Sequence, residues 1–202
     1  VDSEPGSYLY CGLSRDASKE EILERINNNT ITDILNKIEV KAGDVVMVKA
    51  GTIHAIGAGV FICEIQQNSN CTYRMYDYDR RDKFGNPREL HVKKALDVVD
   101  NHKYIKDNKT EVVIARNEHF TEERLVQCKY FEVYKYDVND EAKITVDEAS
   151  FVSVLFINGS GTIETDDYEK TMEFKAGDSF FVSAGLRSII VKGRATMVVT
   201  RV

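Results

Sequence analysis

GDVVMVKAGTIHAIGAGVFICEIQQNSNCTYRMYDYDRR, residues 43–81, is the stretch on which the fold of this chain depends. Runs of apolar and β-branched residues occur at residues 45–48 and 60–66, and a third run of aromatic residues surrounds Arg74. Clusters of Gly and Asn separate the three runs. This pattern predicts antiparallel β-strands that are joined by tight turns.

Three side chains of different chemistry lie on or beside these expected strands. His54 follows the first strand, Glu64 lies within the second and Arg74 lies within the third. Antiparallel pairing would bring the imidazole, the carboxylate and the guanidinium towards one place. Structural interpretations stay open for each: a lone histidine is often structural, Glu64 could pair with Arg74 alone, and Arg74 could stack on the tyrosines around it.

Composition and charge exclude several classes of protein. The chain has 202 residues, of which 43% are hydrophobic, and a net charge of −6 from 27 basic and 33 acidic residues. No basic block is present, which argues against a nucleic-acid surface and gives no support for a membrane surface. No apolar run approaches the ~20 residues of a spanning helix, and we expect no signal peptide ahead of the fold.

The cysteines and the first residue bear on the origin of the chain. The four cysteines include no Cys-x-x-Cys pair, a pattern typical of free thiols in a reducing compartment, so we expect a cytoplasmic protein. The chain opens on Val1 in a stretch of strand character. We therefore expect it to be a piece of a longer polypeptide.

Short helices are expected on both sides of the quoted stretch. Ser18 and Glu21 form a capping box ahead of the first helix. Apolar residues recur at helical spacing over residues 31–38, so the expected helical insert covers about residues 19–38. Residues 91–100 have the pattern of a further helix.

Beyond a polar linker at residues 101–110, the pattern is nearly all strand. A glycine-containing turn is expected at residues 158–161. Short strands at this spacing predict a β-sandwich or a β-barrel. The expected strands comprise residues 112–115, 127–138, 151–157, 172–174, 179–182, 188–191 and 195–201.

An internal repeat links the two halves of the chain. Residues 41–54 have the sequence KAGDVVMVKAGTIH and residues 175–188 have the sequence KAGDSFFVSAGLRS, with seven of fourteen positions identical. The period is too long for a solenoid. Two copies of one β-barrel unit are the better interpretation.

The first copy resembles the second sequence motif of the cupin barrel. Its glycines and His54 occupy the glycine and histidine positions of that motif, and Lys49 occupies the position where proline is usual. In cupins this histidine faces into the barrel and binds a metal. The second copy has Ser188 at the histidine position, so a metal-free second barrel is expected.

The longer stretch from GTIHAIGAG to GNPRELHVKKALDVVD resembles the short bacterial type I mannose-6-phosphate isomerases, most strongly over residues 41–100. The resemblance implies a zinc ion held by a Gln, a Glu and two His, and His54 matches one of these histidines. It also implies that Arg74 is an active-site residue and that Glu64 takes part in catalysis. The other zinc ligands would fall before Val1, so we expect one zinc ion per full-length chain and weak zinc binding by this chain alone.

The chemistry of this family suits those residue types. Aldose–ketose isomerisation moves a proton between C1 and C2, so it needs an acid–base group such as Glu64 and a positive centre such as Arg74 for the developing oxyanion or the phosphate. Zinc can polarise the sugar oxygens. Arg80 and Lys83 are further candidates for binding the substrate phosphate, although a solvated turn is the alternative at those positions.

Together these arguments predict a mainly β fold with two cupin-type (jelly-roll) β-barrels, residues 1–105 and 106–202, and a few short helices on the first. The expected function is zinc-dependent interconversion of mannose 6-phosphate and fructose 6-phosphate, with a small sugar phosphate as the partner. A non-catalytic sugar-binding or regulatory module with two cupin barrels is the alternative. A third possibility is an inactive piece whose second barrel only stabilises the fold.

Overall fold

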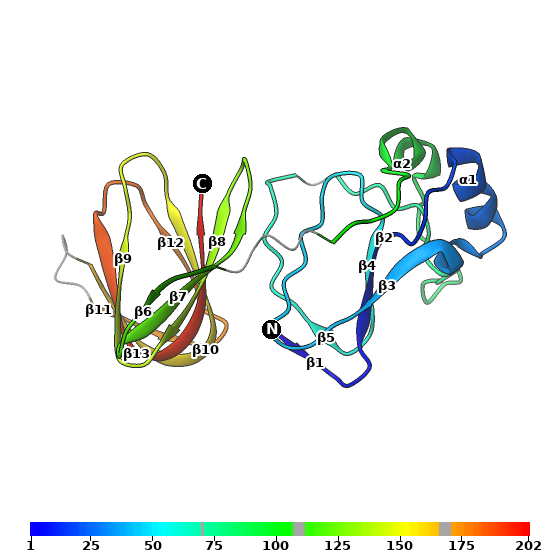
Figure 1. Cartoon of the computed structure of the whole chain (residues 1–202). Coiled ribbons are helices and arrows are strands. Elements are labelled where there is room, and N and C mark those ends of the chain that lie inside the picture. Colours follow the sequence, from blue (N-terminus) through cyan, green and yellow to red (C-terminus); the bar gives the residue numbers. More distant parts are fainter. Residues whose placement is uncertain (70, 107–111, 166–170) are drawn as a thin grey trace. The chain divides into compact units, whose positions relative to one another are not determined.

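Two compact units, Val1–Lys106 and Asp107–Val202, make up the chain, and each has its own buried core (Figure 1). The computed structural model describes residues 1–69, 71–106, 112–165 and 171–202. The end of the expected linker at 101–110 therefore lies outside the described residues, as does Asn70, which belongs to the Asn cluster before the third expected strand. No described helix is long and apolar enough to cross a membrane.

The first unit combines two small antiparallel sheets with short helices. One sheet has the order β3-β2-β4, and the other pairs β1 with β5. The helices lie together at one end of this unit (Figure 1). Its elements are β1 (Asp2–Ser3), β2 (Tyr8–Leu13), α1 (Lys19–Asn27), the 3₁₀ helix η1 (Ile31–Ile34), β3 (Leu35–Glu39), β4 (His54–Ile56), β5 (Val60–Phe61) and α2 (Val92–Val98).

The α1 and α2 helices form where the sequence predicts them. The Glu21 backbone N–H donates to Ser18 Oγ at 3.1 Å, which is the expected N-cap of α1. Ile22 and Ile26 bury the inner face of α1, and Ala95 does the same for α2. These residues join one apolar core in the first unit.

The predicted helix over residues 31–38 is wrong in its second half. Only Ile31–Ile34 is helical, as 3₁₀ helix, and Leu35–Glu39 is strand β3. Ile38 lies opposite Leu9 in the antiparallel pairing of β3 with β2. Pairing with an available strand edge has overridden the helical spacing of the apolar residues.

Two of the strands expected in the stretch 43–81 are absent, and the third is short. Residues 45–48 and the segment around Arg74 belong to no strand, and β5 covers only two residues of the run 60–66. A strand requires a partner for its hydrogen-bond ladder. Among the described residues, no strand pairs with residues 45–48, with residues 62–66 or with the segment around Arg74.

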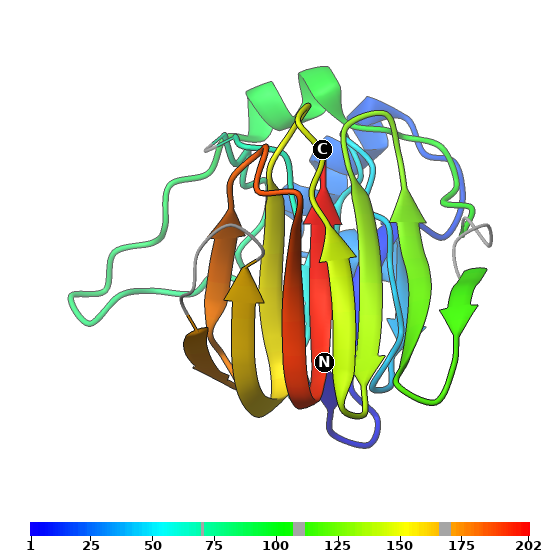
Figure 2. The same cartoon turned by 90° about the vertical axis from the view of Figure 1, so that its left-hand side faces the viewer.

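The second unit is a folded-over antiparallel sheet around an apolar core. Eight strands lie side by side in it (Figure 2). The long strands β10 and β13 pair with each other along their length, and each also pairs with different strands at its two ends. Its elements are β6 (Val112–Arg116), β7 (Phe120–Gln127), β8 (Glu132–Val138), β9 (Glu141–Thr145), β10 (Val152–Thr165), β11 (Thr171–Lys175), β12 (Ser179–Val182) and β13 (Ser188–Arg201).

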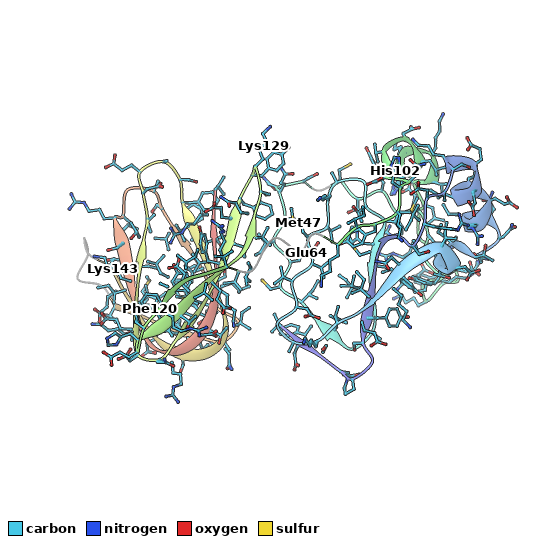
Figure 3. The ribbon with its side chains drawn as sticks, in the orientation of Figure 1. Met47, Glu64, His102, Phe120, Lys129 and Lys143 are labelled. Carbon is cyan, nitrogen blue, oxygen red and sulfur yellow. The ribbon has the colours of Figure 1, made fainter. Side chains whose placement is uncertain are left out.

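Two boundaries in this unit differ from the prediction. The strand expected at 127–138 begins as the end of β7 and continues in β8 after a hairpin turn, with Lys129 at its tip (Figure 3). The turn expected at 158–161 lies inside β10, which continues across a bulge. Gly159 permits this, because a Cβ there would lie 2.0 Å from the Arg194 carbonyl oxygen of β13.

The two copies of the sequence repeat have the same local geometry. In the first copy, Asp44 Oδ2 accepts from the Lys41 backbone N–H at 2.9 Å, and in the second, Asp178 Oδ2 accepts from the Lys175 N–H at 2.9 Å. The glycine before each aspartate has φ of 91° or 90°. The shared KAGD sequence thus makes the same side-chain-capped turn in both units.

Candidate active site

His54 is an exposed residue at the start of β4, and the backbone orients its ring. It lies opposite Cys11 of β2, so the two side chains share one face of the sheet. Its Nδ1 lies 3.0 Å from the Thr52 carbonyl oxygen. Because a carbonyl only accepts, Nδ1 carries a proton, and in the neutral imidazole Nε2 is the nitrogen that could bind a metal.

Arg74 is tied to the segment that leads into α2. Its guanidinium NH1 donates to the Glu89 carbonyl at 3.4 Å, and its backbone carbonyl accepts from the His91 N–H at 2.6 Å. Its side chain makes no ion pair with any described residue. Arg74 therefore presents a fixed positive charge whose remaining donors could bind an anionic or oxygen-rich ligand.

The other arginines of this region differ from Arg74, because carboxylates neutralise them. Arg80 and Arg88 lie 2.7 Å and 3.6 Å from the buried Asp77 carboxylate, and Arg81 pairs with Asp79 at 3.0 Å. The alternative interpretation, in which Arg74 stacks on its neighbouring tyrosines, finds no support among the contacts of the described residues. Arg80 lies 5.5 Å from the centroid of the ring of Tyr78.

The segment that carries Arg80 and Lys83 has the geometry of a capped surface turn. Asp82 Oδ1 accepts from the Phe84 and Asn86 backbone N–H groups at 2.8 Å and 2.9 Å. These two hydrogen bonds lower the pKa of the Asp82 carboxyl, and the one from Asn86 contributes more than the one from Phe84. Lys83 Nζ lies 5.0 Å from the centroid of the Phe84 ring. This geometry favours the solvated-turn interpretation, and a phosphate role for Arg80 or Lys83 stays a prediction.

Glu64 is exposed on the segment that follows β5. In Figure 3 it lies away from the helices of the first unit, which are marked there by the label of His102. It makes no hydrogen bond or ion pair with a described residue, so the structural pair that it could form with Arg74 is not present. Within the described part of the chain, no hydrogen bond or ion pair joins any two of His54, Glu64 and Arg74. Each residue is positioned separately by its own segment.

The described residues do not form a zinc site by themselves. They include no group of three or more His, Cys, Asp or Glu side chains placed to hold a metal ion. Burial raises the pKa of the Cys11 thiol, which lies opposite His54, and also that of Cys63, so both stay protonated and are poor ligands. His54 offers one ring nitrogen to a metal ion, whereas a catalytic zinc site needs about three protein ligands.

Sequence reasoning assigned no role to His91, yet this residue contacts Arg74. Its Nδ1 accepts from the Arg74 backbone N–H at 3.3 Å. A histidine at the N-cap position of a helix, where Ser, Thr, Asp and Asn are preferred, is the signal in the sequence that points to it.

Comparison with known proteins identifies a cupin domain in the second unit. Residues 121–202, in the second unit, match the model of the mannose-6-phosphate isomerase cupin domain. The crystal structure of the mannose-6-phosphate isomerase from Bacillus subtilis superimposes with a TM-score of 0.89 at 35% identity, over 100% of this chain and 62% of that one.

Sequence relatives agree with the structural match. The chain is 40% identical to B. subtilis YvyI over 190 residues (92% of this chain, 57% of YvyI). It is 33% identical to the mannose-6-phosphate isomerase ManA of the same organism over 193 residues (91% of this chain, 56% of ManA). The chain belongs to the mannose-6-phosphate isomerase family, and it spans little more than half the length of these relatives.

Proposed function

We propose that the complete gene product containing this chain interconverts mannose 6-phosphate and fructose 6-phosphate. The observation that carries the proposal is that no carboxylate of the described residues neutralises the positive charge of Arg74. Alone among the arginines at positions 74, 80, 81 and 88, it has no carboxylate partner among the described residues, and it occupies the position that the resemblance assigns to the active site. Relatives named for this activity support the choice of substrate.

The roles of the residues follow from their chemistry. Arg74 would stabilise the oxyanion that develops at C1 or C2, or hold the 6-phosphate, because its charge is fixed and donors other than the one on the Glu89 carbonyl stay available. Glu64 would move the proton between the two carbons, since its carboxylate is not neutralised by a described cation. For the phosphate we favour Arg74 over Arg80, which is committed to Asp77, and Lys83 remains a second candidate.

We also propose one zinc ion per full-length chain, with His54 as one ligand and the others from residues outside this sequence. When bound, zinc would act as a Lewis acid towards the sugar oxygens. Support for this proposal comes from the neutral Nε2 of His54. The matched turn geometry of the repeat supports two cupin barrels, and the four free cysteines support a reducing, cytoplasmic location.

Turnover of mannose 6-phosphate by the complete gene product tests the function, with Arg74→Ala and Arg81→Ala as a matched pair. Removing a charge-stabilising donor from an active site costs about 10²- to 10³-fold in kcat. We expect a loss of that size for Arg74→Ala and near-normal turnover for Arg81→Ala, whose partner Asp79 lies on the surface. Unchanged turnover in Arg74→Ala would remove this residue from the mechanism.

A non-catalytic sugar-binding module is the alternative, and the absence of a three-ligand metal group among the described residues favours it for this chain alone. Bound zinc and turnover, measured on the complete gene product, distinguish the two. Mannose 6-phosphate binding without turnover in a zinc-loaded sample would favour the module.

A further inference from the structure

His91 stands at a helix terminus but does not cap the helix. It is the N-cap residue of α2, where its carbonyl accepts from the Ala95 N–H at 2.9 Å. An N-cap side chain normally accepts from a backbone N–H of the first turn, and that of His91 makes no such bond. The imidazole is therefore available for a different contact.

That contact is with Arg74, 17 residues earlier in the chain. Arg74 N–H donates to His91 Nδ1 at 3.3 Å, and His91 N–H donates to the Arg74 carbonyl at 2.6 Å. The Arg74 guanidinium donates to the Glu89 carbonyl at 3.4 Å. Both the main chain and the side chain of Arg74 are thus held by one short segment.

These hydrogen bonds fix the Arg74 main chain in the way that the backbone hydrogen bonds of a β-sheet would fix it in a strand. The segment around Arg74 lies in no strand, so regular pairing does not fix its main chain. The His91 side chain is only 26% exposed, which partly shields its hydrogen bond from water. As an acceptor, Nδ1 carries no proton, so the ring is neutral with its proton on Nε2, 3.9 Å from Glu89 Oε1.

We propose that His91 is a positioning residue that sets the place of Arg74 in the active site. The proposal rests on the proposed function, because Arg74 matters to turnover only if it contacts the reacting sugar phosphate. A displacement of about 1 Å at a catalytic group can cost roughly 10²-fold in rate. Loss of the imidazole acceptor would release the Arg74 main chain and misplace the guanidinium.

Three variants of the complete gene product separate positioning from general stability. Asn at position 91 can place an acceptor oxygen where Nδ1 lies, whereas Gln places it about one bond further out, and Ala has none. We expect kcat/KM to fall about 10- to 100-fold in His91→Ala and His91→Gln, and to recover substantially in His91→Asn. His102→Ala is the matched control, since His102 is 77% exposed and bonds Asp100.

The comparison of Asn with Gln keeps the test decisive even if His91→Ala fails to fold. Equal kcat/KM in His91→Asn and His91→Gln, or wild-type kcat/KM in a folded His91→Ala, would overturn the proposal. Melting temperatures of the Asn and Gln variants should agree, which excludes global stability as the cause of their difference.

Amide hydrogen exchange at Arg74 gives a readout that does not depend on activity. The Arg74 N–H should exchange slowly in the wild type and in His91→Asn, and faster in His91→Gln. Equal protection in all three proteins would refute the contact. If the gene product shows no isomerase turnover at all, the proposed function fails, while this exchange measurement still reports on the link between His91 and Arg74.

Discussion

At the scale of single residues, neighbouring side chains of the same type differ in what they are free to do. Arg80 and Arg88 share the buried Asp77 carboxylate, whereas Arg74 is held through its backbone and one carbonyl contact. The same distinction applies to histidines. His54 keeps Nε2 available, and His91 uses its Nδ1 on Arg74. Local partners, more than residue type, therefore determine which side chains can contact a substrate.

Sequence reasoning found part of the candidate site and missed the rest for a definite reason. The spacing of glycines around His54 and the motif around Arg74 identify these residues as candidates, and their roles stay predictions. The contact between His91 and Arg74 closes a loop of 17 residues and depends on where α2 begins. A one-dimensional pattern does not encode such a closure.

The pair of His119 and Asp140 gives the second unit a pH-dependent link between two turns. His119 Nδ1 lies 2.9 Å and 3.0 Å from the two Asp140 oxygens. Asp140, with smaller contributions from Glu118 and Glu141, raises the pKa of His119 above its ordinary value of 6.5. A pKa raised by folding means that the link stabilises fully below the unfolded-state pKa and is lost as pH rises through the folded-state pKa.

His119→Gln tests this link. We expect the variant to melt below the wild type at about pH 6, and the difference to shrink as the pH rises to about 9, where the imidazole is neutral in both states. Asp140→Asn should reduce the same pH dependence. Thermal melts over this pH range check the prediction, and a difference that grows with pH would contradict it.

At the scale of elements, long-range pairing decided most departures from the sequence pattern. The helical spacing over residues 31–38 yields to strand β3 because β2 offers an edge. The pattern of residues 127–138 lacks a strong breaker, yet Cys128 N–H donates to the Phe131 carbonyl at 3.0 Å and closes a hairpin. Helices with capping signals were predictable, since those signals are local.

The close antiparallel pairing of β10 with β13 depends on a glycine. Gly159 has φ of +87°, and a Cβ there would lie 2.0 Å from the Arg194 carbonyl oxygen and 2.7 Å from the Ala195 Cα. Gly177 has φ of +90°, but nothing lies within 4 Å of its Cβ position. Comparing alanine substitutions at these two glycines therefore distinguishes the cost of a positive φ from the added cost of a steric clash.

We expect Gly177→Ala to lower the free energy of unfolding by about 1–2 kcal/mol, the cost of a left-handed alanine. Gly159→Ala adds a backbone clash between two strands and should cost at least about 3 kcal/mol. Urea unfolding of both variants measures the difference. Equal midpoints would show that β10 and β13 can separate at this point without cost.

At the scale of the whole molecule, each unit buries its own core. The core of the second unit draws on residues between Tyr134 and Val199, and that of the first on residues between Leu13 and Val99. Phe156 and Phe174 stack at the centre of the second core with ring centroids 3.7 Å apart. Among the residues that the structure describes, neither core contains a buried residue of the other unit.

A fragment of residues 107–202 should consequently fold alone and unfold in one cooperative transition. Phe156→Ala in this fragment should cost about 3–5 kcal/mol, because it empties a fully buried site. Differential scanning calorimetry of the unmodified fragment and of its Phe156→Ala variant checks both expectations. A broad, non-cooperative melt of the unmodified fragment would show that the second unit needs the rest of the chain.

The bond between His54 and the Thr52 carbonyl has a consequence for how this motif can diverge. Since a main-chain oxygen fixes the tautomer, the hydroxyl of Thr52 contributes nothing to it, and position 52 can drift among residue types. Gly51 has no such latitude, because its φ is +83° and a methyl group there would lie 2.7 Å from the Val98 carbonyl. Evolutionary constraint on the turn that leads to His54 therefore falls on Gly51.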